Sequence, residues 1–418
     1  MKLPDDAELE ALRRKGDAEA DPLMEQIVRE HGIHALAGLL DFLFGWRPGT
    51  AFPSPCPGVP RDVVAIAEQF LSNADLPGDA VPGGVDWARV NRSQVFYQDF
   101  KLSGLLVLGC ASLPACYAHP GVALVLMGSG RLSVQVRQRL FETIAFLTTV
   151  MTPGSLGPAK DAPGALWIRK VRLMHALMRR LTLANATPFR SLTDEKPSNV
   201  LLKMNWNAHS DPGVLPIDQV ELGFVLLTFS WLLVRGFGKL GIPMSDSERD
   251  DHIYTWAVIG RGLGIEAELR PLDAADAEAL FESIRGRFES GTEEGRLLAA
   301  ALVVYVIFRQ REVIVEFLPR QRARWLQQLI QWVKPFAEAC LESLARTLVR
   351  DLTGTQTANR LWVARAPLIH WLVGEGLRAA MTLLEMRQKG DWVPHMLGGV
   401  RREKGLPRLL GRQFAKMR

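Results

Sequence analysis

Three residues in one short stretch have the types and spacing needed for metal chemistry. The segment Trp167–Arg180 places Arg172, His175 and Arg179 three and four residues apart. On a helix, at about 100° per residue, these side chains share an arc of roughly 60°. Two cationic neighbours disfavour imidazolium, so His175 is expected to be neutral and able to bind iron. Arginine forks bind carboxylates bidentately, which suits haem propionates, and histidine is a usual ligand of haem iron.

Each polar set also has an interpretation without chemistry. The block above can be a histidine at the edge of the core beside two solvent-exposed arginines. Upstream, Arg139 and Thr143 flank Glu142. They form either a polar patch above a cofactor, or an Arg–Glu surface pair beside a threonine bonded to its own helix. Asp218 and Glu221 open an apolar stretch, where capping of a helix N-terminus explains the first and can explain the second.

The elements that must position these residues are helices. Helical periodicity runs along almost the whole chain, with no alternating β-branched run, so we predict an all-α fold. Pro216 is expected in the first turn of its helix, and Ser245 with Glu248 forms a capping box. The expected helical ranges are 5–44 (one or two helices), Arg61–Ser72, Val85–Phe100, Arg131–Val150, Trp167–Leu183, Pro216–Phe237, Ser245–Leu263, Ala274–Glu289, Glu293–Arg311, Gln321–Val349 and Thr357–Met386. Loops are expected at 46–61, 73–86, Pro153–Pro163 and 184–215.

Composition limits the class of protein. The chain has 418 residues, 48% of them hydrophobic, which is enough for a large buried core. Its net charge of +5 is too small to indicate a nucleic-acid partner. The four cysteines lack the paired spacing of a zinc knuckle, a thioredoxin-like site or a covalently attached c-type haem. We expect one large helical domain over 1–386 and a basic tail over 387–418, which either contacts an anionic membrane surface or is simply solvated.

Two segments bear on location. The polar N-terminus lacks the features of a secretory signal, so the chain as written is expected to be cytoplasmic or peripheral to a membrane, and secreted if a signal was removed. Residues 102–130 carry no charged side chain and are long enough to cross a bilayer. Pro114, His119 and Pro120 interrupt this run. We therefore expect two buried helices around a turn.

The order of the polar blocks resembles the latex clearing protein (rubber oxygenase) and MpaB oxygenase family. The Arg-x-x-His-x-x-x-Arg block is the most specific part of the resemblance, which covers about residues 20–350. The matching blocks are ADPLMEQIV (20–28), GGVDWARV (83–90), RLFET (139–143), VRLMHALMRR (171–180), LPIDQVEL (215–222), LLTFS (226–230) and SERDDHIYTWAVIGRGLGI (247–265).

The resemblance implies a globin-like helical core with added helices around one haem b. By it, His175 looks like the proximal iron ligand, and Arg172 and Arg179 look like the two arginines of the haem environment. Arg139 and Thr143 look like the catalytic polar pair on the distal side.

The sequence also departs from the family pattern. Some members carry a lysine beside the distal threonine that can cap the iron, and Glu142 stands there in this chain. The LP-x-N-Q element reads LPIDQ, with Asp218 in place of asparagine. No residue is assigned as a general base.

Three functions follow as hypotheses. The first is a haem b oxygenase that uses O₂ to cleave C=C bonds of polyisoprene, a smaller isoprenoid or another apolar alkene, giving carbonyl products. Because solid rubber cannot enter a cell, the missing export signal favours the smaller substrate. The second is a hydroxylase, epoxidase or peroxygenase on a lipid-like substrate. The third is a non-enzymatic haem- or lipid-binding protein at a membrane.

Overall fold

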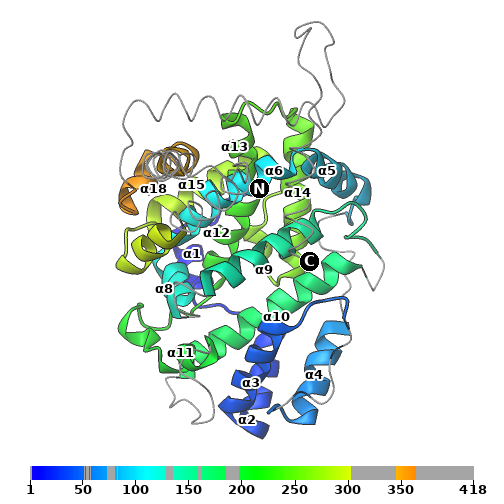
Figure 1. The fold of residues 1–418 in the computed structure, drawn as a ribbon, viewed down its shortest axis with the longest axis vertical. Coiled ribbons are helices and arrows are strands. Elements are labelled where there is room, and N and C mark those ends of the chain that lie inside the picture. The colour runs from blue at the N-terminus through cyan, green and yellow to red at the C-terminus, as the bar shows by residue number, and fades with distance from the viewer. Residues whose placement is uncertain are drawn as a thin grey trace, which may run out of the picture.

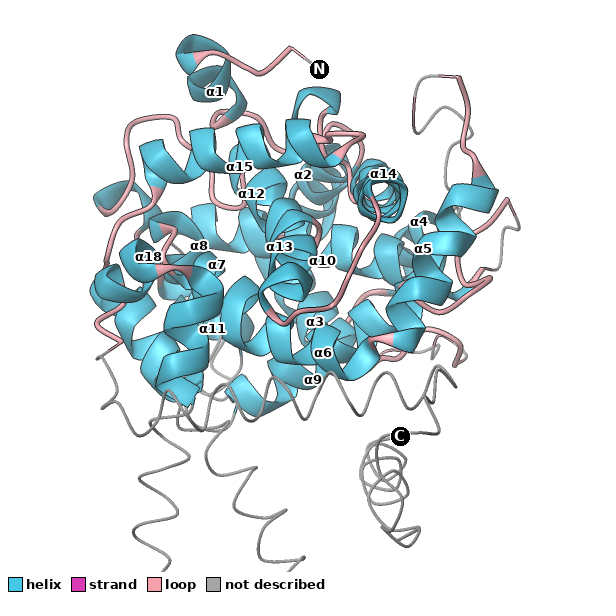
Figure 2. Cartoon of the chain, turned by 90° about the horizontal axis from the view of Figure 1, so that it is seen from above, coloured by secondary structure: helices cyan, strands magenta, loops and turns pink. Residues whose placement is uncertain are grey.

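The computed structural model is helical in the residues that it describes, and none of these forms a β-strand. Figures 1 and 2 show the helices packed around a shared interior. The described residues are 2–50, 58–72, 83–128, 135–158, 162–184, 197–302 and 345–363, with Phe52, Cys56, Val81 and a few single positions of uncertain side chain. The predicted tail 387–418 and His370 lie outside them. The all-α prediction is confirmed.

The helices of the described residues range in length from five residues in α7 to 22 in α10. The first eight are α1 (Asp6–Leu12), α2 (Ala20–His31), α3 (Ile33–Gly45), α4 (Arg61–Ser72), α5 (Trp87–Asp99), α6 (Lys101–Val107), α7 (Leu113–Tyr117) and α8 (Pro120–Gly128). The next eight are α9 (Gln135–Val150), α10 (Pro163–Ala184), α11 (Pro197–Lys203), α12 (Gln219–Phe229), α13 (Trp231–Lys239), α14 (Asp246–Gly262), α15 (Ala274–Phe288) and α18 (Thr355–Arg360). Residues 293–302 and 345–353 are also helical.

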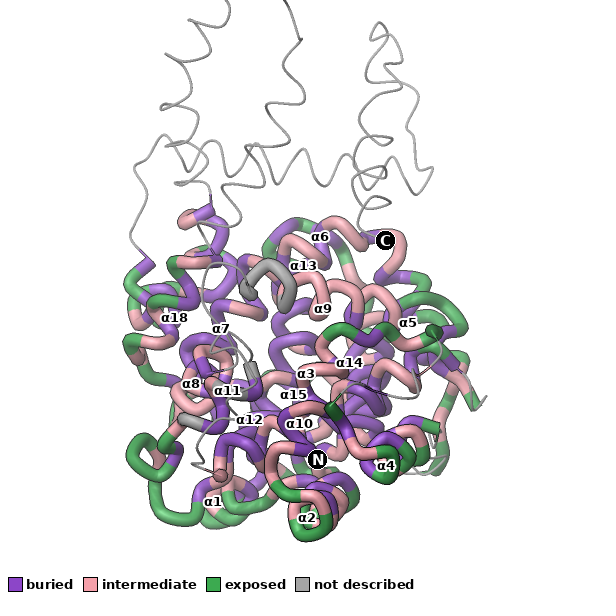
Figure 3. Tube along the Cα trace, turned by 60° about the horizontal axis from the view of Figure 1, so that its bottom comes forward, coloured by how far each residue is buried: buried purple, intermediate pink, exposed green. Residues whose placement is uncertain are grey.

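Helix α10 is the central element. It packs against α2, α3, α4, α9, α11 and α14, and runs through the middle of the molecule in Figures 1 and 2. Its apolar residues join two hydrophobic clusters, with Ile168 in the larger one and Leu173 and Leu177 in the smaller one. Buried segments fill the interior in Figure 3, while α1 and α2 carry much of the exposed surface. A side chain on α10 is therefore held from several sides.

The described part of the uncharged stretch, 102–128, folds as expected, into two helical segments around a turn. The first segment contains a π-helical turn at Leu108–Ser112, where the N–H of Leu113 bonds to the carbonyl of Leu108. Pro114 follows directly, at the start of α7. A proline has no N–H to donate, and the widened turn accommodates it without ending the helical path. The turn at Ala118 and His119 then leads into α8.

Helix α12 begins later than predicted. Asp218 is its N-cap and accepts a hydrogen bond from the N–H of Glu221. Pro216 lies in the turn before it, and Ile217 takes a left-handed backbone conformation at φ 55°. The prediction of Pro216 in the first helical turn was wrong, because a capping carboxylate sets the helix start more strongly than a proline does.

One stretch of the described chain has the length and composition of a membrane span. This is Gln219–Lys239, and 83% of its apolar window is buried inside the protein. A second candidate pairs Trp87–Asp99 with Lys101–Tyr117, two segments bent by 86°. Burial of this extent is typical of a core helix in a globular fold.

Several predicted boundaries need correction. Range 5–44 holds three helices, because Gly32 at φ 80° separates α2 from α3. Helix α10 begins at Pro163, which was placed in a loop, since proline is well tolerated in a first turn. The expected irregular stretch 184–215 contains α11 and a 3₁₀ turn. The range Thr357–Met386 is not one helix, because α18 ends at Arg360 and Trp362 has φ 56°. The capping box of Ser245 and Glu248 is confirmed.

Candidate active site

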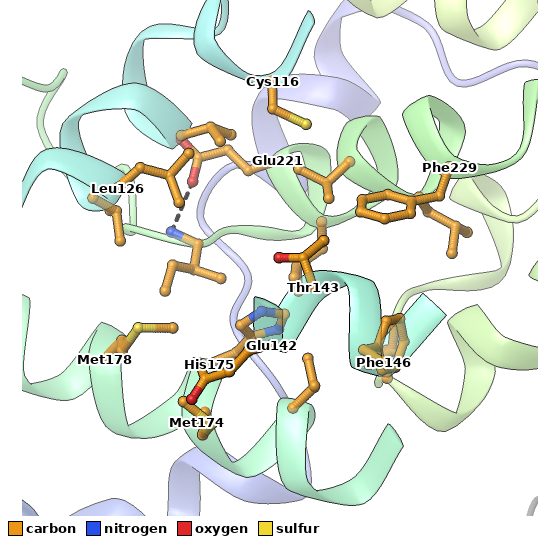
Figure 4. A pocket seen from close by; sticks show the side chains of 18 of the residues that line it. Cys116, Leu126, Glu142, Thr143, Phe146, Met174, His175, Met178, Glu221 and Phe229 are labelled. Carbon is orange, nitrogen blue, oxygen red and sulfur yellow. Dashed lines mark hydrogen bonds between the residues drawn. The ribbon is translucent and has the colours of Figure 1, made fainter. Parts of the chain in front are cut away.

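A cavity of about 280 Å³ lies between α7, α8, α9, α10, α12 and α14. Most of its wall is apolar, including Phe146, Leu222, Val225 and Phe229. Its polar wall residues are Cys116, Glu142, Thr143, Lys170, His175 and Glu221. Figure 4 shows His175 and Glu221 on opposite sides of this space, with Thr143 between them. An apolar chamber with a few polar groups is the usual form of a small-molecule site.

His175 projects from α10 into the wall of the cavity. Burial, together with the charge of Arg179, lowers the pKa of His175 from 6.5 to about 4. The imidazole is therefore neutral at pH 7, as the sequence predicted, although burial contributes more than the neighbouring charges. Its Nδ1 is buried and has no hydrogen-bond partner within the described residues. A neutral imidazole in an apolar chamber has the form that binds a metal.

The two arginines beside His175 lie inside the protein but not on the cavity wall. Arg172 and Arg179 are both buried, and neither lines the cavity. Arg172 makes a two-point contact with Asp17, from Nε to Oδ2 at 2.6 Å and from Nη2 to Oδ1 at 2.7 Å. Its Nη1 also lies 2.7 Å from Oε2 of Glu19. In the structure this fork contacts the protein's own carboxylates, and the place of Arg172 in a haem environment stays a prediction.

Arg179 is used in the same way. Its Nη1 pairs with Asp21, its Nε donates to the carbonyl of Pro216 at 3.1 Å, and its Nη2 donates to the carbonyl of Ile217. The alternative of two solvent-exposed arginines is wrong, since both side chains are buried. A buried guanidinium needs acceptors for its donors, and these come from segments that lie far away in sequence. The two arginines thus tie α10 to the N-terminal segment and to the start of α12.

The contact of Asp17 with Arg172 is electrostatically strong. Burial alone would raise the pKa of Asp17, but hydrogen bonds and charge from Arg172 hold it below its ordinary value. Asp17 also accepts the backbone N–H groups of Glu19 and Ala20, at 2.9 and 3.0 Å. Gly264, at φ 78°, lies so close that a Cβ there would meet Asp17 and Arg172. This tight junction fixes the turn of α10 just before His175.

Helix α9 supplies Glu142 and Thr143 to the cavity wall. Arg139 lies on the same helix, but its side chain is outside what the structure describes. The pairing of Arg139 with Thr143 above a cofactor stays a prediction. Figure 4 shows the Thr143 hydroxyl directed toward the space between Glu221 and His175. The position is suitable for a hydroxyl that hydrogen-bonds to a small ligand on this side of the cavity.

The sequence analysis missed Lys170, five residues before His175 on the cavity wall. Its Nζ donates to the carbonyl of Trp46 at 2.8 Å. Burial lowers the pKa of Lys170, the charge of Glu142 opposes that shift, and Arg47 adds to it. Spacing from His175 did not indicate this residue, because positions five apart lie about 140° apart around a helix.

The sequence analysis also gave Glu221 too small a role. Its Oε2 accepts the N–H of Ile217, the residue before the N-cap Asp218, at 2.8 Å, and so closes the turn that leads into α12. The same carboxyl group forms part of the cavity wall and is only 5% exposed. Burial and the nearby Asp218 raise its pKa well above the ordinary value. From the sequence, an acidic residue at the start of an apolar helix is interpreted as a cap. Only the packing shows that Glu221 also lines the cavity.

The other histidines in the described part of the chain do not form a metal site of three or more ligands. Within the described part of the chain, no group of three or more His, Cys, Asp or Glu side chains is arranged to hold a metal ion. His252 is buried on α14, with Nδ1 3.3 Å from the hydroxyl of Ser93. Burial lowers the pKa of His252 to about 4.

The donor set around His175 fits a haem iron by ligand type. It offers a neutral imidazole in an apolar chamber and a hydroxyl group across from it. One feature is unusual, because a metal-bound imidazole commonly donates its second N–H to an acceptor, and Nδ1 has none among the described residues. A single histidine with open space before it matches one axial ligand rather than a closed structural metal site.

Comparison with known proteins assigns the chain to a protein family. Residues 100–384 match the family described as ER-bound oxygenase mpaB/B'/rubber oxygenase, catalytic domain. The chain belongs to this family. Its fold is similar to that of latex clearing protein in the closed state, with a TM-score of 0.61 and 16% identity over 97% of this chain and 90% of the other. No curated protein sequence matches it.

Membership in this oxygenase family bears on the site in two ways. The matched range contains the cavity residues Glu142, Thr143, His175 and Glu221. It begins after residues 20–28 and 83–90, two blocks that the sequence analysis had included. The carboxylates that hold Arg172 and Arg179 therefore come from outside the catalytic domain as the family defines it.

Proposed function

We propose that this rubber oxygenase family member is a haem b-dependent enzyme that uses O₂ to cleave C=C bonds in an isoprenoid or other apolar alkene. The products would be carbonyl compounds. The observation that carries the proposal is His175, a neutral imidazole on the wall of an apolar cavity within the matched oxygenase domain. Family membership supports oxygenase chemistry, and the apolar wall supports an alkene substrate.

His175 would hold the haem iron, which supplies the activation of O₂ when bound. Arg172 and Arg179 would act as positioning residues, because they fix the helix that carries His175. Thr143 would hydrogen-bond to oxygen on the other side of the cavity, with Arg139 as its predicted partner. Phe146 and its apolar neighbours would exclude water and hold the alkene by burial.

A second reaction is supported by Glu142. This carboxyl group lies on the cavity wall beside Thr143, where some family members carry a lysine. A carboxyl group there changes the charge around bound oxygen. Hydroxylation or epoxidation that leaves the carbon skeleton intact is therefore the second candidate. Analysis of products separates the two, since paired carbonyl fragments support cleavage and an unbroken oxygenated product supports the alternative.

The first test is optical. Visible spectra of the oxidised and dithionite-reduced protein, with pyridine haemochrome analysis, should show b-type haem near one per chain. His175→Ala should lose most of this haem, while Leu297→Ala, at an exposed position, should keep it. Circular dichroism checks that both variants fold. Full haem content and full turnover in folded His175→Ala would contradict the assignment of the ligand.

A further inference from the structure

Glu221 has no part in the reaction proposed above, yet it occupies the side of the cavity opposite His175 (Figure 4). Its Oε2 accepts the N–H of Ile217 at 2.8 Å. Its Oε1 lies against Gly121, where any Cβ would collide with the carboxyl group. Glycine at this position lets the carboxyl group lie against α8. The carboxyl group is thus held in place, with one oxygen already bonded.

No arginine or lysine in the described part of the chain forms an ion pair with Glu221. Arg13 and Arg179 lower its pKa only from a distance, and burial together with Asp218 outweighs them. The net shift is upward, which favours the protonated form of the carboxyl group over the carboxylate. A protonated carboxyl group can donate one hydrogen bond and accept others.

His119 is a second buried polar group beside Glu221, and it does not line the cavity. It is 7% exposed, and neither ring nitrogen has a hydrogen-bond partner within the described residues. Its Nδ1 lies 3.9 Å from Oε1 of Glu221, too far for a direct hydrogen bond. Burial lowers the pKa of His119 to about 3, so the ring is neutral. Buried polar groups without partners are costly, and this neutral ring at 3.9 Å gives the carboxyl group of Glu221 neither a charge nor a hydrogen bond.

We propose that Glu221, with His119 behind it, binds a hydroxyl group of the substrate, and that the preferred substrate is an isoprenoid alcohol rather than a pure hydrocarbon. This rests on the proposed function. A hydroxyl group donates and accepts at once, which matches a protonated carboxyl group. The chain of such a molecule would then run along Leu222 and Val225 toward His175. The anchor fixes which double bond reaches the oxygen side.

The test compares two ligands of the same skeleton, farnesol and the hydrocarbon in which hydrogen replaces its hydroxyl group. Dissociation constants are measured by calorimetry for the wild-type protein, Glu221→Gln and Glu221→Leu. The ratio of the two constants is compared between proteins, because differences in ligand solubility then cancel. Glutamine keeps a donor and an acceptor and serves as the matched control. We expect Glu221→Leu to lose about tenfold in preference for the alcohol, and Glu221→Gln to keep most of it.

Two results would overturn the proposal. One is a ratio in folded Glu221→Leu equal to that of the wild type. The other is an infrared measurement on the wild type, in which the variant Glu221→Gln serves only to assign a band. The infrared carbonyl band of the protonated carboxyl, assigned by its loss in Glu221→Gln, should shift with farnesol and stay in place with the hydrocarbon. An unshifted band refutes the hydroxyl contact. Haem content, measured on the same samples, reports separately on the proposed function.

Discussion

The side chain of Asp17, in the N-terminal segment, should stabilise the helix that carries His175. Asp17 and Arg172 are 4% and 8% exposed, and they meet through two hydrogen bonds. Removing one partner of a buried ion pair costs about 3–5 kcal/mol, because the other charge stays buried. Glu19 keeps its contact with Arg172, which reduces the loss. We therefore expect Asp17→Asn to lower the free energy of unfolding by about 2–3 kcal/mol.

Urea unfolding at pH 7 measures this effect. The matched control is Glu266→Gln, which breaks the exposed pair of Glu266 with Lys15 and should change stability by less than about 0.5 kcal/mol. The pKa of Asp17 is lowered in the folded state, so its contribution is present above the ordinary value near 4 and is lost as pH falls through the folded value. Asp17→Asn should lack this acid-dependent loss.

A haem measurement extends the same prediction. If the contact between Asp17 and Arg172 positions His175, Asp17→Asn should also broaden or shift the haem absorption band, while Glu266→Gln leaves it unchanged. The double variant Asp17→Leu with Arg172→Met removes both charges and should be more stable than either single variant. Equal stability of Asp17→Asn and the wild type would refute the reasoning.

Three more outcomes follow. The pKa of His252 is about 4 in the folded state, below its unfolded value of 6.5, so the free energy of unfolding decreases as pH falls through this window. Between pH 7 and 5 we expect a decrease of about 2 kcal/mol from this group in urea unfolding, and His252→Asn should abolish this decrease. Gly121→Ala should lower the free energy of unfolding by about 1–3 kcal/mol and disturb Glu221, since the added Cβ collides with its carboxyl group. The control is Gly238→Ala, in α13 with open space around it, which should be neutral or slightly stabilising. Equal losses of stability in the two variants would contradict the clash. Gly264→Ala should destabilise through its φ of 78° and its contacts with Asp17 and Arg172, and a melting temperature equal to that of the wild type would show that this junction is not tight.

Most helix positions could be predicted from the sequence, because periodicity and capping are local. The capping box of Ser245 and Glu248 and the bounds of α4 agree with the structure. The errors lie where two local signals compete. Pro216 and Asp218 both favour a helix start, and the capping carboxylate prevails. Trp362 ends a predicted helix through a backbone conformation that residue type did not indicate.

The site divides in the same way. The sequence alone determined that His175 lies on a helix between two arginines and that the fold is helical. Both follow from the spacing of residue types along the chain. Only the tertiary structure decided what the arginines bind. Asp17 and Asp21 reach them from more than 150 residues away. Only the tertiary structure likewise showed that Glu221 lies on the cavity wall. The burial of its carboxyl group depends on the helices that pack around it and not on its neighbours in the chain.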